Sequence, residues 1–232
     1  MTRVVEIGAG TGALTRALLT HGIPVTALEI DGDLVEILRA REDLAVAEIV
    51  QADALSFDYA SAGTSEPWCA AGNLPYNIAT PLILRWLEAA APPARIVAMI
   101  QRDVADRLTA RPSTRQYGSL TLFASYWSTV TRVFVLGPGA FYPRPNVESA
   151  VVVLERRPQP AVTVRDTALF LQVVRAGFAY RRKTLANSLS LALGIDRART
   201  QRALGALSLD TEIRAEQLDL GAFAALADHL AP

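Results

Sequence analysis

Two spacings of apolar residues alternate along the first part of the chain, and together they predict an α/β fold. Short β-branched runs have the length of buried parallel strands, and each is followed by a stretch with helical spacing. The expected strands are residues 3–8, 24–30, 45–50, 68–71 and 94–100, and the expected helices are 13–21, 33–41, 81–91 and 101–108. This order is typical of a mostly parallel sheet covered by helices.

The pattern changes in the second part of the chain. Residues 123–136 and 147–154 are rich in β-formers and flank a turn with several prolines, which predicts an antiparallel hairpin at the end of the sheet. Beyond the linker-like segment 158–160 only helical patterns follow, at residues 166–179, 182–192, 197–207 and 220–230. We therefore expect one domain at residues 1–157 and a small all-α domain at 161–232.

Composition narrows the class of protein. Apolar residues make up 51% of the chain, but none of the apolar runs reaches the length of a membrane span. With Cys69 as the one cysteine and only 2 histidines, neither a disulfide nor a metal site is expected. The sequence predicts a soluble, cytosolic protein.

The net charge of zero hides a strong asymmetry. Residues 1–70 carry 4 arginines against 11 acidic residues, whereas residues 71–232 carry 19 basic against 12 acidic residues. A basic surface confined to the second part would suit a nucleic-acid partner.

A glycine-rich turn follows the first strand. Gly8, Gly10 and Gly12 allow a ligand to approach the backbone closely, next to the free N–H groups of a helix start. Their spacing is not the G-x-G-x-x-G pattern of dinucleotide sites, which disfavours a pyrophosphate ligand.

The next two strands end in carboxylates. Glu29 is placed to accept the hydroxyls of a ribose, and Asp53 is placed to accept an adenine amino group. We expect Asp31 and Asp33 to cap a helix, and Glu6 either to contact the ligand or to order the glycine turn. Gly, Glu and Asp at three strand ends fit S-adenosylmethionine better than NAD or ATP.

The segment Asn73-Leu74-Pro75-Tyr76 follows the fourth strand. The Asn73 amide oxygen and the Leu74 carbonyl are two acceptors, and Pro75 restricts the geometry of the turn. Tyr76 offers a flat face for a nucleobase. The segment predicts a pocket that holds an exocyclic amino group; the alternative is a proline-containing turn with a packed tyrosine.

Two further segments are candidates for RNA contact. Phe141 and Tyr142 lie between prolines and are placed to cover a flipped base from the side opposite Tyr76, or else to pack in the fold. Residues 181–183 form a basic triplet beside aromatic residues, which suits phosphate contact or is an ordinary solvated helix end.

Taken together, these motifs resemble those of the KsgA-type ribosomal RNA adenine dimethyltransferases. The resemblance spans nearly the whole chain and is carried by residues 6–12, 29–31, 51–54, 72–78, 101–118, 140–151 and 181–189. It implies a Rossmann-like class I S-adenosylmethionine-dependent methyltransferase domain with a small helical C-terminal domain. The implied reaction is dimethylation of N6 of two adjacent adenosines near the 3′ end of small-subunit (16S) ribosomal RNA during subunit biogenesis.

The resemblance also implies roles for individual residues and partners. The catalytic residues would be Asn73, Leu74, Pro75 and Tyr76. The cofactor-binding residues would be Glu6, Gly8, Gly10, Glu29, Ile30, Asp53, Ala54 and Asn73. The substrate-binding residues would be Tyr76, Phe141, Arg181, Arg182 and Lys183. The partner would be the small-subunit RNA within the pre-30S particle, bound by a monomer without a metal.

Three considerations qualify the resemblance. Members of the family usually carry a further segment of about thirty residues, with a Gln-Asn-Phe-Leu motif, ahead of the first strand, whereas this sequence begins at that strand. Either the start codon is assigned late or this version lacks the segment, and its absence would affect cofactor affinity and part of the RNA surface. A large-subunit ribosomal RNA methyltransferase of the macrolide-resistance type shares the catalytic turn, but residues 141–151 and 181–189 disfavour it. A non-catalytic RNA-binding assembly factor on the same fold is the remaining alternative.

Overall fold

The computed structural model describes residues 3–60 and 67–231. The chain divides into two compact units, which are described separately. The first contains Met1–Ala105 and Thr129–Arg156, and the second contains Asp106–Ser128 and Arg157–Pro232. The second unit thus takes in a segment well ahead of residue 157, and the division into folding domains at residues 157–161 stays a prediction.

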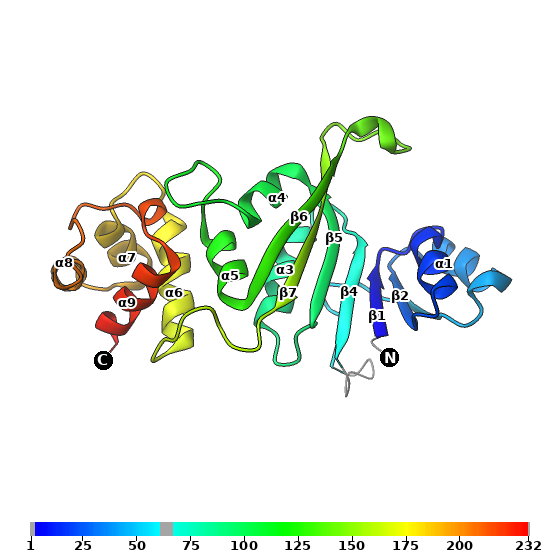
Figure 1. Cartoon of the computed structure of the whole chain (residues 1–232), viewed down its shortest axis with the longest axis horizontal. Helices are drawn as coiled ribbons and strands as arrows, with labels where there is room; N and C mark the ends of the chain where they lie inside the picture. Colours follow the sequence, from blue (N-terminus) through cyan, green and yellow to red (C-terminus); the bar gives the residue numbers. More distant parts are fainter. Residues whose placement is uncertain (1–2, 61–66, 232) are drawn as a thin grey trace. The chain divides into compact units, whose positions relative to one another are not determined.

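Within the described residues, the first unit is built on a seven-stranded sheet with the order β3-β2-β1-β4-β5-β7-β6. Its strands are β1 (Arg3–Ile7), β2 (Val25–Glu29), β3 (Glu48–Gln51), β4 (Trp68–Asn73), β5 (Arg95–Gln101), β6 (Ser128–Leu136) and β7 (Ser149–Arg156). The first five strands are parallel, and β7 runs antiparallel to β5. Figure 1 shows β6 and β7 extending past β5 as a long hairpin. The predicted α/β class is confirmed.

Helices α1 (Ala13–Thr20), α2 (Gly32–Arg39) and α3 (Ala79–Glu88) alternate with these strands. Asp31 caps α2 as predicted, since its side chain accepts hydrogen bonds from the backbone N–H groups of Asp33 and Leu34. Asp33 lies in the first turn of the helix instead of at the cap. A negative charge there still favours the helix dipole.

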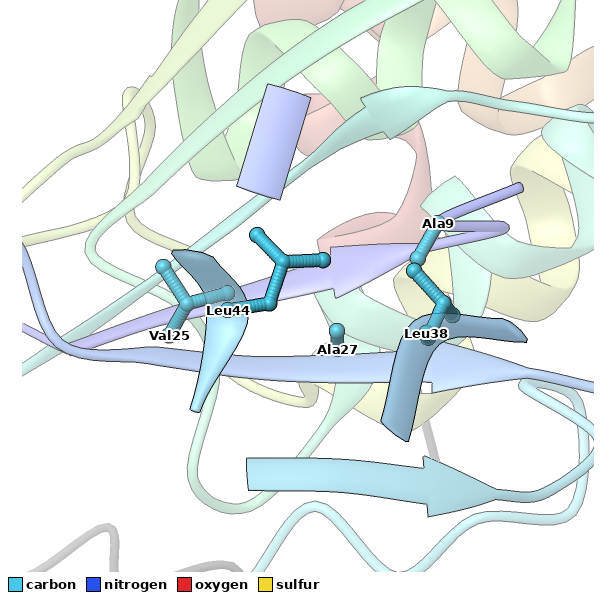
Figure 2. Packing of buried hydrophobic residues seen from close by; sticks show 5 residues of the cluster. All are labelled: Ala9, Val25, Ala27, Leu38 and Leu44. Atoms are coloured by element: carbon cyan, nitrogen blue, oxygen red, sulfur yellow. The ribbon is translucent and has the colours of Figure 1, made fainter. Parts of the chain in front are cut away.

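A compact apolar cluster packs against the glycine turn at residues 8–12. Figure 2 shows its members, which are Ala9, Val25, Ala27, Leu38 and Leu44. Ala9 belongs to the turn itself, so burying its methyl group fixes the turn against β2 and α2. Gly12 is required here because a Cβ atom would lie only 2.6 Å from a Leu44 methyl carbon.

The second unit consists of helices. They are α5 (Ser119–Trp127), α6 (Thr167–Ala179), α7 (Leu185–Leu193), α8 (Arg197–Ala206) and α9 (Leu220–Leu230), with α4 (Arg102–Leu108) crossing from the first unit. The prediction of β structure from residue 123 was wrong for residues 123–127, which lie in α5. That run is buried almost throughout, so its apolar pattern could not separate a buried helix from a buried strand.

The linker-like segment 158–160 is held at both ends in the second unit. The Arg157 N–H donates to the Trp127 carbonyl, and the Ala161 N–H donates to the Tyr126 carbonyl. The basic triplet precedes α7 instead of starting it, because Thr184 is the N-cap and its hydroxyl accepts from the Asn187 N–H. Among the described helices, none combines the length and apolar character needed to cross a membrane.

Candidate active site at the carboxyl ends of β1 to β4

The direction of winding reverses between β1 and β4. From β1 the chain adds β2 and β3 on one side, while β4 and β5 lie on the other. Open α/β sheets bind their ligands in the crevice outside the strand ends at such a reversal. The residues that follow β1, β2, β3 and β4 include Gly8, Ile30, Asp53 and Leu74, so most of the candidate residues share this edge.

Contacts between strand ends bring the candidates together. The Gly10 N–H donates to Glu29 Oε2 over 2.9 Å, which ties the glycine turn to the end of β2. A Cβ atom on Gly8 would lie 3.9 Å from the Asn73 carbonyl oxygen and 3.8 Å from Pro75 Cδ. The glycine turn and the Asn73–Tyr76 segment are therefore direct neighbours.

Glu29 is a mostly buried hydrogen-bond acceptor. Its Oε1 atom accepts from the N–H groups of Ile30 and Asp31, at 2.8 and 3.1 Å, in addition to the Gly10 bond at Oε2. A carboxylate offers about four acceptor positions. Within residues 3–60 and 67–231, one position therefore stays open for a ribose hydroxyl, and a second hydroxyl would have to displace the Gly10 N–H. Ile30 is 66% exposed beside it and presents an apolar surface.

Glu6 faces the protein interior. It is buried, and its Oε2 atom accepts a 2.6 Å hydrogen bond from Thr15 Oγ1 on α1. Burial raises the pKa of the Glu6 carboxyl, while the hydrogen bonds from Thr15 act in the opposite direction. Glu6 thus anchors α1 behind the glycine turn; its direct contact with a cofactor stays a prediction.

Asp53 shapes the loop after β3. Its Oδ1 atom accepts from the Leu55 N–H, and its carbonyl accepts from the N–H groups of Ser56 and Phe57. Among the described residues, Oδ2 makes no hydrogen bond, and the side chain lies in an exposed position. Asp53 is therefore able to accept an amino group. Ala54 is buried beneath it.

The Asn73–Tyr76 segment is pinned at its start. Asn73 ends β4 beside Met99, and the next N–H, on Leu74, donates to the Met99 carbonyl over 3.0 Å. The Leu74 side chain is 1% exposed, whereas Asn73 is exposed. Because neighbouring side chains of an extended segment point to opposite sides, burial of Leu74 leaves Asn73 on the exposed side.

A pocket of about 350 Å³ opens at this segment. It is lined by Asn73, Leu74, Pro75, Tyr76, Phe141, Tyr142, Pro143 and Pro145. The structure thus brings the catalytic candidates and Phe141 to one cavity, from segments more than sixty positions apart. The cavity lies within the size range of small-molecule sites.

Ser149 is a residue of this site that the sequence did not reveal. It is fully buried at the start of β7, and its Oγ atom lies 2.8 Å from Tyr76 Oη, so that either hydroxyl can donate. This hydrogen bond holds the far end of the Tyr76 ring. The partners are 73 positions apart, so no local motif could have connected them.

Ser149→Ala is expected to lower kcat/KM for the RNA substrate that the resemblance implies roughly fivefold, because a hydrogen bond of about 1 kcal/mol is removed and the Tyr76 ring becomes looser. The measurement is a double-mutant cycle with Tyr76→Phe. In the Tyr76→Phe background the Ser149→Ala change should have almost no further effect. Simply additive effects would contradict this role.

In the second unit, the three basic candidates lie between α6 and α7. Arg181, Arg182 and Lys183 are exposed, and Arg181 Nη2 donates to the Arg115 carbonyl over 2.8 Å. This bond joins the triplet to the loop at residues 111–115, which also carries Arg111. Two basic segments therefore share one surface of the unit.

Comparison with known proteins decides the family. The family model described as ribosomal RNA adenine dimethylase matches residues 1–231. The chain belongs to the ribosomal RNA adenine dimethylase family. The dimethylases are S-adenosylmethionine-dependent methyltransferases, so the predicted cofactor class is confirmed.

Curated relatives named ribosomal RNA small subunit methyltransferase A resemble this dimethylase along almost its full length. The protein of Hahella chejuensis is 43% identical over 98% of this chain and 82% of its own. The protein of Pseudomonas aeruginosa is 42% identical over 99% of this chain and 84% of its own. The protein of Streptococcus gordonii is 39% identical over 98% and 81%.

Solved structures agree with the fold of a dimethylase. A dimethyladenosine transferase from Plasmodium falciparum superposes with a TM-score of 0.78 over 97% of this chain and 88% of its own, at 23% identity. The 23S rRNA methyltransferase ErmE superposes with a TM-score of 0.72 over 99% and 91%, at 25% identity. Among the described residues, no cluster of three or more His, Cys, Asp or Glu side chains could hold a metal ion.

Proposed function

We propose that this dimethylase transfers methyl groups from S-adenosylmethionine to N6 of two adjacent adenosines near the 3′ end of small-subunit ribosomal RNA. The observation that supports it most directly is the pocket formed by the Asn73–Tyr76 segment and the loop that contains Phe141. Two residues that line that pocket, Asn73 and Pro75, are neighbours of Gly8, which lies at the same sheet edge as Glu29 and Asp53. The names of the small-subunit methyltransferase A relatives support the choice of RNA.

The residues at the strand ends fit the adenosine part of the cofactor. Glu29 would accept a ribose hydroxyl at its remaining acceptor position, Ile30 would provide an apolar surface for the adenine ring, and Asp53 Oδ2 would accept the amino group. Gly8 has a φ of +67°, so a side chain at that position would be strained as well as close to Pro75. When bound, S-adenosylmethionine supplies an electrophilic methyl group on a sulfonium centre.

The N6 nitrogen of adenine is a poor nucleophile because its lone pair is delocalised into the ring. Asn73 Oδ1 and the Leu74 carbonyl oxygen would accept the two N6 hydrogens and favour a tetrahedral nitrogen with its lone pair free. Such preorganised acceptors also stabilise the positive charge that develops on nitrogen. Holding the two reactants in line contributes about 7–11 kcal/mol in well-oriented systems. The proton leaves after transfer, so no general base has to act before the attack.

Aromatic side chains would hold the extruded base. Tyr76, fixed by Ser149, and Phe141 line the same pocket from different segments. Base stacking on one aromatic ring is worth about 1–3 kcal/mol. Because an adenosine in folded RNA is stacked on its neighbours, it must leave that stack to reach Asn73.

We propose a precursor of the small ribosomal subunit as the physiological partner, a monomer as the active form and the cytoplasm as the location. The exposed triplet of Arg181, Arg182 and Lys183, with its link to the Arg115 loop, supports phosphate contact.

Arg182→Gln is expected to weaken RNA binding. It should also reduce the slope of log K against log salt by roughly 0.7–0.9, because the variant neutralises one phosphate fewer than the wild type. Arg16→Gln removes the same charge from an exposed site on α1 and is the control, with an unchanged slope expected. Binding is measured by filter retention at several salt concentrations. Equal salt slopes for Arg182→Gln and the wild type would show that Arg182 does not contact an RNA phosphate.

The proposed function is tested by incubating the protein with labelled S-adenosylmethionine and one of two RNA substrates. The first is small subunits from a strain that lacks this modification, and the second is protein-free large-subunit RNA. Label recovered as N6-dimethyladenosine from the small subunits alone supports the proposal. Label in the large-subunit RNA would favour the macrolide-resistance type of enzyme, and binding to either RNA without label would favour a non-catalytic assembly factor.

A further inference from the structure

Arg85 connects the helix after the catalytic segment to the loop that carries Asp53. It lies on α3, which starts three residues after Tyr76, and its guanidinium donates to two backbone carbonyls of that loop. The Nη1 atom lies 2.9 Å from the Ala54 oxygen, and the Nη2 atom lies 2.7 Å from the Phe57 oxygen. A guanidinium is suited to this bridge because its N–H groups are held in a rigid planar fork.

An aromatic cluster supports the same loop. The Arg85 guanidinium carbon lies 5.1 Å from the centroid of the Tyr59 ring, and Tyr59 Oη donates to the Ala54 oxygen over 2.9 Å. Tyr59 itself stacks on Trp68, with ring centroids 5.3 Å apart and planes within 8°. The Ala54 carbonyl therefore receives two side-chain hydrogen bonds, one from α3 and one from the cluster.

These contacts hold the loop on which the Asp53 carboxylate lies. Residues 53–57 form a closed turn, because the N–H groups of Leu55, Ser56 and Phe57 all donate to Asp53. Arg85 holds this turn at two points within it, the carbonyls of Ala54 and Phe57. Without the guanidinium, the Phe57 carbonyl would lose the hydrogen bond from Arg85 and the Ala54 carbonyl would keep only the one from Tyr59, so the loop that carries the Asp53 carboxylate would be held less firmly.

We propose that Arg85 is a positioning residue for cofactor recognition, which sets Asp53 to accept the adenine amino group. This rests on the proposed function, since it assumes that the ligand of Asp53 is the adenine of S-adenosylmethionine. Under this proposal α3 connects the two halves of the site. The helix begins just after the Asn73–Tyr76 segment, which would hold the target base, and its residue Arg85 holds the Asp53 loop, which would bind the cofactor.

The test compares two ligands on the full chain. S-adenosylhomocysteine has the adenine amino group, and its 6-deamino analogue has hydrogen in that place. Dissociation constants for both are measured by calorimetry. The wild type should prefer S-adenosylhomocysteine roughly tenfold, as one hydrogen bond to a charged acceptor provides.

Arg85→Ala should bind S-adenosylhomocysteine roughly tenfold more weakly and lose most of the preference between the two ligands. Arg85→Lys should retain an intermediate preference, because an ammonium group reaches only one of the two carbonyls well. Arg39→Ala is the matched control. Arg39 also donates to one backbone carbonyl, that of Ile49 in β3, and its removal should leave the preference unchanged.

A purely structural role for Arg85 predicts a different result. Thermal unfolding monitored by circular dichroism shows at which temperature each variant is folded, and binding is measured well below that point. If folded Arg85→Ala or Arg85→Lys keeps the wild-type preference for the amino group, the proposal is overturned. It is equally overturned if the wild type shows no preference. Neither result depends on RNA, so the methylation assay judges the proposed function separately.

Discussion

Asn73→Ala is expected to lower the rate of methyl transfer about 10²–10³-fold at saturating cofactor, as the removal of one preorganised hydrogen-bonding group does in other enzymes. The alanine leaves one N6 hydrogen of the target base without its acceptor, while Leu74 and Tyr76 keep their places. The measurement is single-turnover methylation of small subunits. Calorimetry with S-adenosylmethionine shows separately how much Asn73 contributes to cofactor affinity.

Asn146→Ala is the control for this substitution. Asn146 is exposed and follows Pro145, but it does not line the pocket. Its replacement should leave the rate within about twofold, as surface changes usually do. A rate near the wild-type value for Asn73→Ala would show that the amide oxygen does not hold the amino group.

Gly72→Ala is expected to damage both stability and activity. A Cβ atom at Gly72 would lie 2.5 Å from the Ile7 carbonyl oxygen and 3.2 Å from the Ile7 N, so β1 and β4 would have to move apart. Overpacking of this kind costs about 1–3 kcal/mol. The shift also moves Asn73, and a misplacement of about 1 Å can cost 10²-fold in rate. Chemical unfolding and single-turnover methylation are the two measurements.

Gly205→Ala provides the matched control. Gly205 lies in α8, and a Cβ atom there would meet no atom within 4 Å. Alanine is favoured over glycine in a helix by roughly 0.5–1 kcal/mol, so this variant should be slightly more stable and fully active. If Gly72→Ala behaved in the same way, the contact between Ile7 and Gly72 would not restrict the site.

Most strands and helices of the first unit could be predicted from the sequence, because the spacing of apolar residues changes clearly from one element to the next. Asp31 could be predicted as a cap because capping is a local interaction, two residues from its partner. Residues 119–127 could not be assigned, since the consecutive residues Thr121, Leu122 and Phe123 point in different directions around the helix and are all buried. A helix without a polar face has the same pattern as a buried strand.

The candidate site shows the same division between local and distant information. The Asn73–Tyr76 segment could be recognised because its chemistry is contiguous in sequence. The roles of Ser149 and Arg85 could not be recognised in this way. Ser149 is 73 residues from its partner Tyr76, and Arg85 is 28–31 residues from the two carbonyls that it binds. The role of Ser149 arises from the antiparallel pairing of β7 with β5, and that of Arg85 from the packing of α3 against the loop after β3. Neither arrangement can be read from a local motif.

The reversal of β7 has a consequence for how such an enzyme can change its target. Because β7 is antiparallel to β5, Ser149 at its beginning lies opposite Gln101 at the end of β5. The loop that precedes Ser149 therefore returns to the same edge as the cofactor residues without a further crossover helix. A hairpin of this kind can be lengthened or rebuilt while strands β1 to β3 keep their places. Under the proposed assignment, acceptor choice lies with the hairpin loop and donor binding with the ends of β1 to β3, so selection can alter one without rebuilding the other.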